Sequence, residues 1–468
     1  MLSEITGEFS VYVPDSDSMN PKPDTRSGPH RTEVKTGANR TRCTALWMLL
    51  SFSLPACQAA ADTWPGWRGA SGQGVTAEVD LPTQWTATEN IRWQAGLRGK
   101  GNSSPAITRS SLVVTSQDET DGSLWVTCLD PQDGQLRWET QVGRGRFVAS
   151  GPTSLYVHRH NPATASPAAN EQSIVAFFGT GDLVCFEHSG KEIWRRNLSD
   201  DYGAYDIKFG IASSPRIWGS RVFLTCIHKG PSYVVAFELD SGREAWLTPR
   251  SYPGMGDAPD AYTSPVILPR DGAAALLIVS GCDHVDAYDT ETGERVWYSG
   301  GLMIPDDEYS RIIASPAVGD GMVVAAAGKG EQAIALRADG IGNVTESGRL
   351  WSTSKLSDCP SPVVHNDICY SVRDEGVATA FSMKTGEVVW RLRLGGNRYQ
   401  ASPIIGDGKV YFLSLDGKCT VVREGEDGEI LSRNTVEGEF YATPAISHGM
   451  IFLRDRSALY AVGRPGGN

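Results

Sequence analysis

Residues 288–297 read YDTETGERVW, and close variants of this stretch recur along the chain. FELDSGREAW ends at Trp246 and FSMKTGEVVW ends at Trp390. A degenerate copy has Leu431 at the position of the tryptophan. The remaining copies end at Trp138, Trp194 and Trp351. These copies end 39 to 56 residues apart, and a segment that returns at such intervals indicates a fold built from repeated units.

A second marker, a small residue followed by proline and an apolar run, is in phase with the first. It occurs at Pro105, Pro152, Pro215, Pro265, Pro316, Pro362, Pro403 and Pro444. Consecutive markers are 41 to 63 residues apart. Eight markers in phase with the tryptophans predict eight structural units.

Each unit contains short runs rich in β-branched and aromatic residues, such as KVYFLS (409–414) and RVFLTCI (221–227). Gly and Asp pairs such as GDGK (406–409) separate the runs, as expected for hairpin turns between strands. No stretch has a sustained helical period, which excludes alternating strands and helices. Units of this length with four strands each predict an all-β fold, an eight-bladed β-propeller.

The two ends of the chain contain one complete unit between them. The last unit runs from Pro444 to ALYAV (458–462) and has no tryptophan strand. NIRWQAGL (90–97) has such a strand, with Trp93, before the first proline marker. We therefore expect residues 91–97 to complete the last blade and close the ring, which removes the exposed edges of an open one.

The phased prolines and the tryptophan segments resemble the pyrroloquinoline-quinone (PQQ) repeat family of eight-bladed propellers. The segment WPGWRGASGQGV (64–75) is similar to the start of its single-propeller members. The family includes quinoprotein alcohol dehydrogenases and a non-catalytic lipoprotein of the outer-membrane protein assembly machine, which this chain resembles more. The resemblance implies that tryptophans dock between blades, here Trp93, Trp138, Trp194, Trp246, Trp297, Trp351 and Trp390.

The N-terminal region predicts export. Residues 1–42 are polar and without periodicity, and we expect them to be disordered. Residues 43–61 follow Arg40 and Arg42 and combine a short apolar run with small residues, as in a secretory signal peptide. The propeller is expected over 62–468. Cleavage after Ala61 and lipidation of Cys57 are both compatible with the sequence. The expected location is the periplasm or the outer membrane.

Charge and cysteine content limit the function further. The formal net charge of −12 argues against binding nucleic acid, and leaves a lipid anchor as the expected contact with a membrane. Seven cysteines follow Cys57, an odd number, and most lie in strand runs where cysteine is a small apolar residue. Free buried thiols are the main expectation, with a Cys359–Cys369 disulfide as the alternative.

No cofactor is expected, with PQQ and Ca²⁺ as the alternative. The quinoprotein enzymes of the resembled family use an adjacent Cys–Cys pair, and this chain has none. His158 and His160 have the spacing of metal ligands but no third ligand nearby in sequence, so a solvated loop is favoured. PDDEY (305–309) lacks the pattern of a calcium loop and is also interpreted as solvated.

The connections from each tryptophan strand to the next proline strand are expected to meet around the central channel on one face. They combine aromatic and charged residues, which are common in binding sites. The candidate binding face comprises Arg98, Lys100, Arg146, Tyr205, Lys208, Asp257, Asp260, Tyr262, Asp306, Tyr309, Arg311, Arg398, Tyr399 and Tyr441. The predicted function is an exported, non-catalytic binding or scaffold propeller of the cell envelope that binds a protein, a small ligand or a carbohydrate there. The alternative is a PQQ- and calcium-dependent alcohol or sugar dehydrogenase, and a channel face that only holds water also remains possible.

Overall fold

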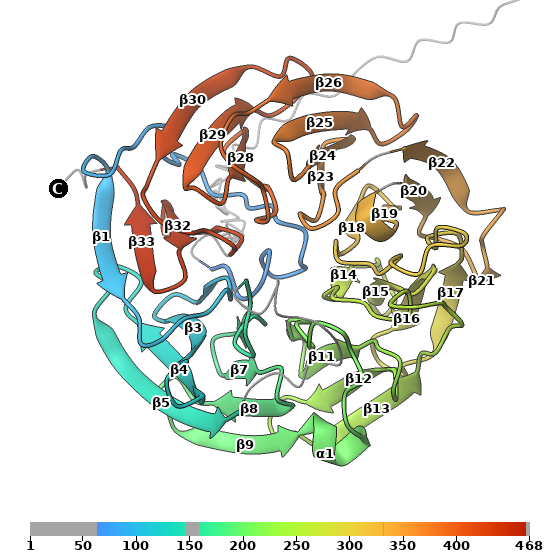
Figure 1. The fold of residues 1–468 in the computed structure, drawn as a ribbon, viewed down its shortest axis with the longest axis horizontal. Helices are drawn as coiled ribbons and strands as arrows, with labels where there is room; N and C mark the ends of the chain where they lie inside the picture. The colour runs from blue at the N-terminus through green and yellow to red at the C-terminus, as the bar shows by residue number, and fades with distance from the viewer. Residues whose placement is uncertain (1–62, 146–158, 331, 355, 465–468) are drawn as a thin grey trace, which may run out of the picture. The chain divides into compact units, whose positions relative to one another are not determined.

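A computed structural model describes residues 63–145, 159–330, 332–354 and 356–464. Within these ranges, eight sheets, each with four antiparallel strands, surround a central axis (Figure 1). The prediction of an all-β, eight-bladed propeller is confirmed. Outside the described residues lie the expected polar extension 1–42, the expected leader 43–61, Cys57, Arg146, Pro152 and His158.

In seven blades the four strands follow one another along the chain, apart from β21, which is described below. The strands of each blade are given from the axis outward. Blades 1 to 3 comprise β2 (Ala106–Ile107), β3 (Leu112–Gln117), β4 (Ser123–Leu129), β5 (Leu136–Arg144); β6 (Ala168–Ala169), β7 (Ile174–Phe177), β8 (Asp182–Phe186), β9 (Glu192–Asn197); and β10 (Arg216–Trp218), β11 (Arg221–Cys226), β12 (Tyr233–Glu238), β13 (Glu244–Pro249). Blades 4 and 5 comprise β14 (Val266–Leu268), β15 (Leu276–Gly281), β16 (His284–Asp289), β17 (Arg295–Ser299); and β18 (Ala317–Gly319), β19 (Met322–Ala326), β20 (Gln332–Arg337), β22 (Arg349–Ser354). Blades 6 and 7 comprise β23 (Val363–His365), β24 (Ile368–Val372), β25 (Val377–Ser382), β26 (Val388–Arg393); and β27 (Ile404–Gly406), β28 (Lys409–Leu413), β29 (Lys418–Arg423), β30 (Ile430–Thr435).

Three short elements stand outside this pattern. The strand β21 (Gly342–Asn343) pairs in parallel with β17 and gives blade 4 a fifth strand. The helix α1 (Leu198–Tyr202) and the 3₁₀ turn η2 (Gly328–Gly330) lie in connections. Within the described ranges, no helix has both the length and the apolar run needed to cross a bilayer.

Blade 8 closes the ring with both ends of the chain, as predicted. Its strands are β31 (Ala445–Ser447), β32 (Met450–Arg454), β33 (Ala458–Val462) and, on the outside, β1 (Ile91–Gly96). The strand β1 pairs antiparallel with β33, with Trp93 opposite Ala461 and Gly96 opposite Ala458. The predicted closing segment 91–97 therefore differs from β1 by one residue.

The second proline marker requires a correction. Pro152 was expected to open blade 2, but the first strand of that blade, β6, directly follows Pro167. ASPAA (165–169) is thus the marker, and the extra residues of this unit precede it. The sequence SGPTS around Pro152 has glycine before its proline, whereas ASPAA has Ser166 there.

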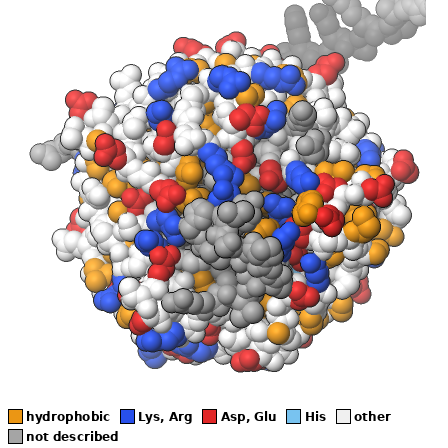
Figure 2. Space-filling view, in the orientation of Figure 1, with side chains coloured by type: hydrophobic (Ala, Val, Ile, Leu, Met, Phe, Trp, Pro, Cys, Tyr) orange, Lys and Arg blue, Asp and Glu red, His pale blue; other side chains and the backbone are white. Residues whose placement is uncertain are grey.

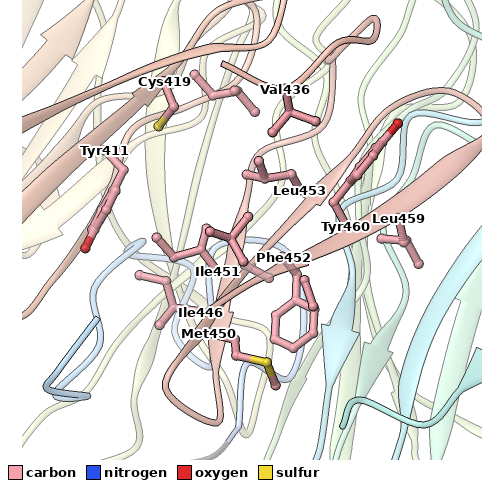
Figure 3. Close-up of a cluster of buried hydrophobic side chains, with 14 of the residues drawn as sticks. Tyr411, Cys419, Val436, Ile446, Met450, Ile451, Phe452, Leu453, Leu459 and Tyr460 are labelled. Carbon is pink, nitrogen blue, oxygen red and sulfur yellow. The ribbon is translucent and has the colours of Figure 1, made fainter. Parts of the chain in front are cut away.

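The apolar core lies between neighbouring blades. The middle strands are buried almost throughout, while outer strands such as β26 alternate between buried and exposed positions, because only one of their faces meets the next blade. One cluster joins Tyr411 and Cys419 of blade 7 to Ile446 and Phe452 of blade 8 (Figure 3). All seven cysteines among the described residues are free, so the alternative Cys359–Cys369 disulfide is absent.

The repeated tryptophans link every blade except blade 7 to the next one. The indole Nε1 of Trp246 on β13 donates to the carbonyl of Thr290 in the β16–β17 turn (3.1 Å). The same bond joins Trp93 to Pro131, Trp138 to His188, Trp194 to Leu239, Trp297 to Ala338, Trp351 to Met383 and Trp390 to Gly425. Six of these rings lie over a turn glycine with positive φ, namely Gly134, Gly190, Gly242, Gly293, Gly386 and Gly428. A Cβ atom at any of the six would lie within 2.9 Å of the indole, so both the backbone conformation and the space require glycine.

Blade 8 also explains why the seventh unit has Leu431 instead of tryptophan. No chain turn joins β33 to β1, since these strands come from opposite ends of the chain, so a ring on β30 would have no glycine turn to cover. The N-terminal segment supplies Trp85 to the same apolar cluster as Leu431. The backbone N–H of Trp85 donates to Asn434 on β30 (3.0 Å).

Residues 64–78, here called the lead-in, cross the centre of the ring (blue coil in Figure 1). Backbone hydrogen bonds join the lead-in to the innermost strands of blades 1, 2, 4 and 7, through Ile107, Ala169, Ile267 and Ile405. The buried guanidinium of Arg216 in blade 3 donates to the carbonyls of Gly69 (2.5 Å) and Trp67 (2.7 Å). Arg68 donates to the carbonyl of Pro362 in blade 6, and the carboxylate of Glu78 accepts backbone N–H groups of blade 8. The lead-in is thus attached to seven of the eight blades.

Candidate functional site

A cavity of about 400 Å³ lies on the axis of the ring. Trp67 of the lead-in is part of its lining, and the walls come from the segments that enter the inner strands of all the blades. In Figure 2, lysine, arginine and acidic side chains surround the centre of the face. The cavity is therefore the point at which the blade connections meet.

Hydroxyl groups encircle the cavity, one from each proline marker. The Oγ of Ser264 accepts the backbone N–H of Ser214 (2.9 Å), and the N–H of Ser264 donates to Ser315 Oγ (2.8 Å). Equivalent bonds run from Ser104 to Ser166, Ser166 to Ser214, Ser315 to Ser361, Ser361 to Ser402 and Ser402 to Thr443. These seven bonds satisfy backbone donors that would otherwise face the channel. The marker therefore requires serine or threonine before proline, which is more specific than the small residue expected from sequence.

The cavity wall is basic. Arg159, Arg311 and Arg398 line it together with His160. Burial and the nearby Arg456 lower the pKa of His160 to about 4, so this imidazole is neutral at pH 7. His160 had been expected in a solvated loop, and it instead belongs to the cavity lining.

Acidic groups hold two of these arginines in place. Asp257, which is buried, forms ion pairs with Arg311 (3.6 Å) and with Lys208 (3.1 Å). Asp374 pairs with Arg398 (3.6 Å). Burial raises the pKa of Asp374 to about 6, and it also raises the pKa of Asp358. Among the described residues that line the cavity itself, three arginines face one carboxylate, Asp358, so the lining has excess positive charge.

Four residues of the candidate face line the cavity: Tyr262, Arg311, Arg398 and Tyr441. Lys208, Asp257, Asp260 and Tyr309 form a network beside it. In this network Lys208 lies over the Tyr309 ring (5.0 Å), and its backbone N–H donates to Asp260 (3.0 Å).

The other members of the candidate face lie elsewhere. Arg98 pairs with Glu139 over the Trp125 ring (4.4 Å), and Lys100 pairs with Glu119 (3.1 Å). Tyr205 packs edge-on against His228 (5.5 Å). Tyr399 is fully buried and donates to the carbonyl of Gly395 (2.7 Å), so it braces its loop instead of facing the cavity.

Asp306 is exposed with positive φ and does not line the cavity. Sequence reasoning also missed cavity residues, chiefly Trp67, Arg159, Phe209, Cys359 and Gln400. Gln400 lies in a connection that was selected, and its position next to Arg398 could have indicated it. Arg159 lies in an insertion without a repeat period, where the sequence gives no signal.

The donor groups of this cavity do not fit calcium-bound PQQ. Calcium takes six to eight oxygen ligands, several of them carboxylates. Among the described residues that line the cavity, Asp358 is the one carboxylate, and its raised pKa opposes ionisation. The part of the chain that the structure describes also contains no group of three or more His, Cys, Asp or Glu residues placed to bind a metal ion.

Comparison with known proteins identifies the family to which this chain belongs. A family profile described as "Outer membrane protein assembly factor BamB" matches residues 61–297 and 341–424, which is more than half of the chain. The chain belongs to the BamB family. The BamB protein of Bordetella pertussis is 22% identical over 402 residues, covering 82% of this chain and 87% of that protein. The BamB protein of Yersinia pestis is 22% identical over 337 residues, covering 68% and 75%.

Solved structures agree on the fold. BamB from Moraxella catarrhalis has a TM-score of 0.56 at 17% identity, covering 80% of this chain and 99% of that one. A quinohemoprotein alcohol dehydrogenase from Comamonas testosteroni has a TM-score of 0.64 at 11% identity, covering 88% and 82%. At these identities the likeness extends to the propeller and not to the chemistry, because one fold supports unrelated functions. BamB proteins and quinoproteins thus share the ring that this chain forms.

Proposed function

We propose that this protein is a non-catalytic scaffold of the bacterial cell envelope, which binds a protein partner in outer-membrane protein assembly. The observation that carries the proposal is the family match over most of the ring. Relatives that cover 82% and 68% of the chain are outer membrane protein assembly factors by name.

The proposed contact surface is the face around the central cavity. Tyr262, Tyr441 and Arg311 meet there, and tyrosine and arginine are over-represented among residues that dominate protein interfaces. The excess positive charge around Arg311 and Arg398 suits an acidic surface on the partner, which would accelerate association.

Gene replacement in the bacterium that encodes the protein tests this proposal. Deleting the gene should lower the amount of folded outer-membrane protein, measured by heat-modifiability on gels. A chain with Arg311→Glu and Arg398→Glu should resemble the deletion, while Arg144→Glu on the exposed strand β5 should resemble the unmodified chain. Normal assembly in the deletion strain would overturn the proposal.

The competing function, a PQQ- and calcium-dependent dehydrogenase, is tested on the purified protein. Titration with PQQ and Ca²⁺ followed by cofactor absorbance and dye-linked alcohol oxidation should show neither stoichiometric binding nor turnover. Turnover would replace the scaffold with an enzyme. A glycan array would detect carbohydrate binding at the same face.

Export remains part of the proposal. Residues 43–61 have the composition of a leader, and Cys57 follows an apolar run as in lipoproteins. Cell fractionation should recover the protein from the periplasm or the outer membrane. Mass spectrometry of its N-terminus will distinguish cleavage after Ala61 from lipidation of Cys57.

A further inference from the structure

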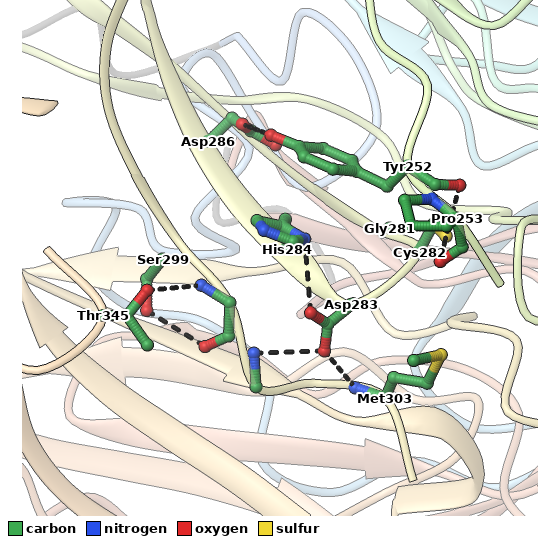
Figure 4. Close-up of polar contacts among 12 residues, drawn as sticks. Tyr252, Pro253, Gly281, Cys282, Asp283, His284, Asp286, Ser299, Met303 and Thr345 are labelled. Carbon is green, nitrogen blue, oxygen red and sulfur yellow. Dashed lines mark hydrogen bonds and ion pairs between the residues drawn. The ribbon is translucent and has the colours of Figure 1, made fainter. Parts of the chain in front are cut away.

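A second cavity, of about 330 Å³, lies between blades 3 and 4, apart from the axis. The β11–β12 loop lines it with His228 and Ser232, and the β13–β14 loop lines it with Arg250 and Tyr252. Cys282, in the β15–β16 turn, completes this wall and contacts the carbonyl of Tyr252 (Figure 4). Here this space is called the inter-blade pocket.

The charge of the inter-blade pocket is positive. Among the described residues that line it, Lys229 and Arg250 are cations and none is an aspartate or glutamate. Lys229 is exposed, so solvent screens its charge, whereas the Arg250 side chain is 1% exposed. Arg250 is therefore the dominant charge in this pocket.

Arg250 is only partly satisfied by the protein. Its Nε donates to Asp286 (2.9 Å), and its Nη2 donates to the carbonyls of Gly281 (2.8 Å) and His284 (3.0 Å). Its Nη1 has no hydrogen-bond partner among the described residues.

The carboxylate of Asp286 is shared between Arg250 and other groups. It also pairs with Arg295 (3.4 Å) and accepts the hydroxyl of Tyr252 (2.5 Å; Figure 4). Two guanidinium groups thus share one carboxylate. Arg250, Arg295 and Asp286 together have one excess positive charge.

His228 presents a second donor. Its Nδ1 accepts the backbone N–H groups of Gly230 (3.0 Å) and Asp206 (3.3 Å), so the ring proton resides on Nε2. Burial lowers the pKa of His228 to about 4, which keeps the ring neutral at pH 7. The side chain is 3% exposed, and within the described residues Nε2 has no partner.

Ser232 presents a third donor. This residue is 6% exposed, and its Oγ has no partner in the part of the chain that the structure describes. Leaving a buried donor without an acceptor is unfavourable, so three around one pocket require an explanation. An acceptor bound in the pocket would satisfy all three.

We infer that the inter-blade pocket binds a carboxylate group through Arg250, His228 and Ser232. A carboxylate has two acceptor oxygens and one negative charge, which match three donors and a cluster with one excess positive charge. A dianionic phosphate would exceed that charge. The carboxylate can come from a free organic acid or from the C-terminus of a peptide, and the inference does not depend on the function proposed above.

Calorimetric titration of the full chain at pH 7 tests this inference. N-acetylglycine presents a carboxylate, and N-acetylglycinamide has the same shape without the charge. We expect the acid to bind at least about tenfold more tightly than the amide, because the charge-assisted hydrogen bonds are lost with the amide. The peptide acetyl-Ala-Ala-Gly, with a free or an amidated C-terminus, distinguishes a chain terminus from the free acid as the source.

Two variants assign the binding to this pocket. His228→Asn keeps an acceptor where Nδ1 lies and removes the Nε2 donor, while Ser232→Ala removes a hydroxyl with little change in shape. Each should weaken binding of N-acetylglycine about three- to tenfold, and the matched control Ser189→Ala, in the β8–β9 turn, should leave binding unchanged.

Three results would overturn the inference. The first is that neither N-acetylglycine nor the peptide with a free C-terminus binds saturably. The second is that the acid and its amide bind equally. The third is that binding persists in both pocket variants but is lost in Arg311→Gln of the central cavity. The first would mean that water alone satisfies these donors.

Discussion

At the residue scale, the contact between a turn glycine and a tryptophan is the unit that joins blades. Gly293 has φ +73°, and a Cβ atom there would lie 2.5 Å from the Trp246 ring. The same tryptophan donates its N–H to Thr290 in that turn. Adding one methyl group at Gly293 would therefore strain the backbone of the turn and also displace the docked tryptophan ring.

We predict that Gly293→Ala lowers the free energy of unfolding by about 3–5 kcal/mol, from left-handed strain and a displaced ring. Gly219→Ala is the matched control, because Gly219 has φ +60° and open space around its Cα. The control should lose only about 1–2 kcal/mol. Urea unfolding measures both, and equal losses would show that the docked ring contributes nothing.

Asp260 provides a pH-dependent contribution to stability. It is fully buried, and burial raises its pKa from 3.8 to about 6. Between these values the folded protein holds a proton that the unfolded chain has released, so stability falls as the pH rises through this window. Above pH 6 the loss is complete.

We predict that Asp260→Asn removes this dependence. Relative to the unmodified chain, the variant should gain about 1–3 kcal/mol of unfolding free energy between pH 3.5 and pH 7.5. Urea unfolding at the two pH values measures this change. A difference between the two chains that stays constant with pH would contradict it.

At the scale of elements, the lead-in depends on Arg68 and Arg216, which form no ion pair with a carboxylate among the residues that the structure describes. Arg216 is 1% exposed and bonds to the carbonyls of Trp67 and Gly69, and burial lowers its pKa to about 10. The five N–H donors of a guanidinium allow one side chain to bond several carbonyls at once, here those of the lead-in and, through Nε, that of Pro265 (3.4 Å). The arginine thus fastens an irregular segment to the regular sheet.

We predict that Arg216→Met loosens the lead-in while the blades stay folded. Trypsin should then cut after Arg68, which is buried in the unmodified chain. Arg221→Met is the control, because Arg221 bonds to Thr290 and Glu291 and not to the lead-in. Mass spectrometry of timed digests identifies the cut, and equal cutting in both variants would contradict the assigned role of Arg216.

The repeated strands could be predicted from sequence because every blade buries its middle strands against its neighbours and so needs the same apolar pattern. The marker located seven inner strands, and it failed at Pro152 because the hydrogen-bonding role of the hydroxyl before proline was not recognised. Ser166 has that hydroxyl and Gly151 does not. The cavity was predicted less well, since Arg159 and His160 lie in an insertion that has no period, and burial of Tyr399 depends on contacts distant in sequence.

At the scale of the whole molecule, the ring is held closed by non-covalent pairing alone among the described residues. Gly96 and Ala458 are directly opposite on β1 and β33, at the outer edge of blade 8. Pairs in that position have the Cα separation that a disulfide spans. A covalent bond there would enclose nearly the whole propeller.

We predict that Gly96→Cys with Ala458→Cys forms a disulfide on oxidation and stabilises the ring by up to about 5 kcal/mol, because the enclosed loop is very long. The same protein with a reducing agent is the control. Urea unfolding and non-reducing gels measure the effect. A pair that does not oxidise would show that β1 and β33 are not neighbours.

The route of the lead-in also sets an order of events during synthesis. Residues 64–96 are made before any complete blade, yet Glu78 and β1 find their partners in blade 8, whose other strands are made after those of blades 1 to 7. Blades 1 to 7 and the bonds of the lead-in to them can form as these blades emerge, but Glu78 and β1 must wait until blade 8 has emerged. The final step of folding is therefore the completion of blade 8, and a nascent chain stalled before residue 445 would still have Glu78 and β1 without their partners.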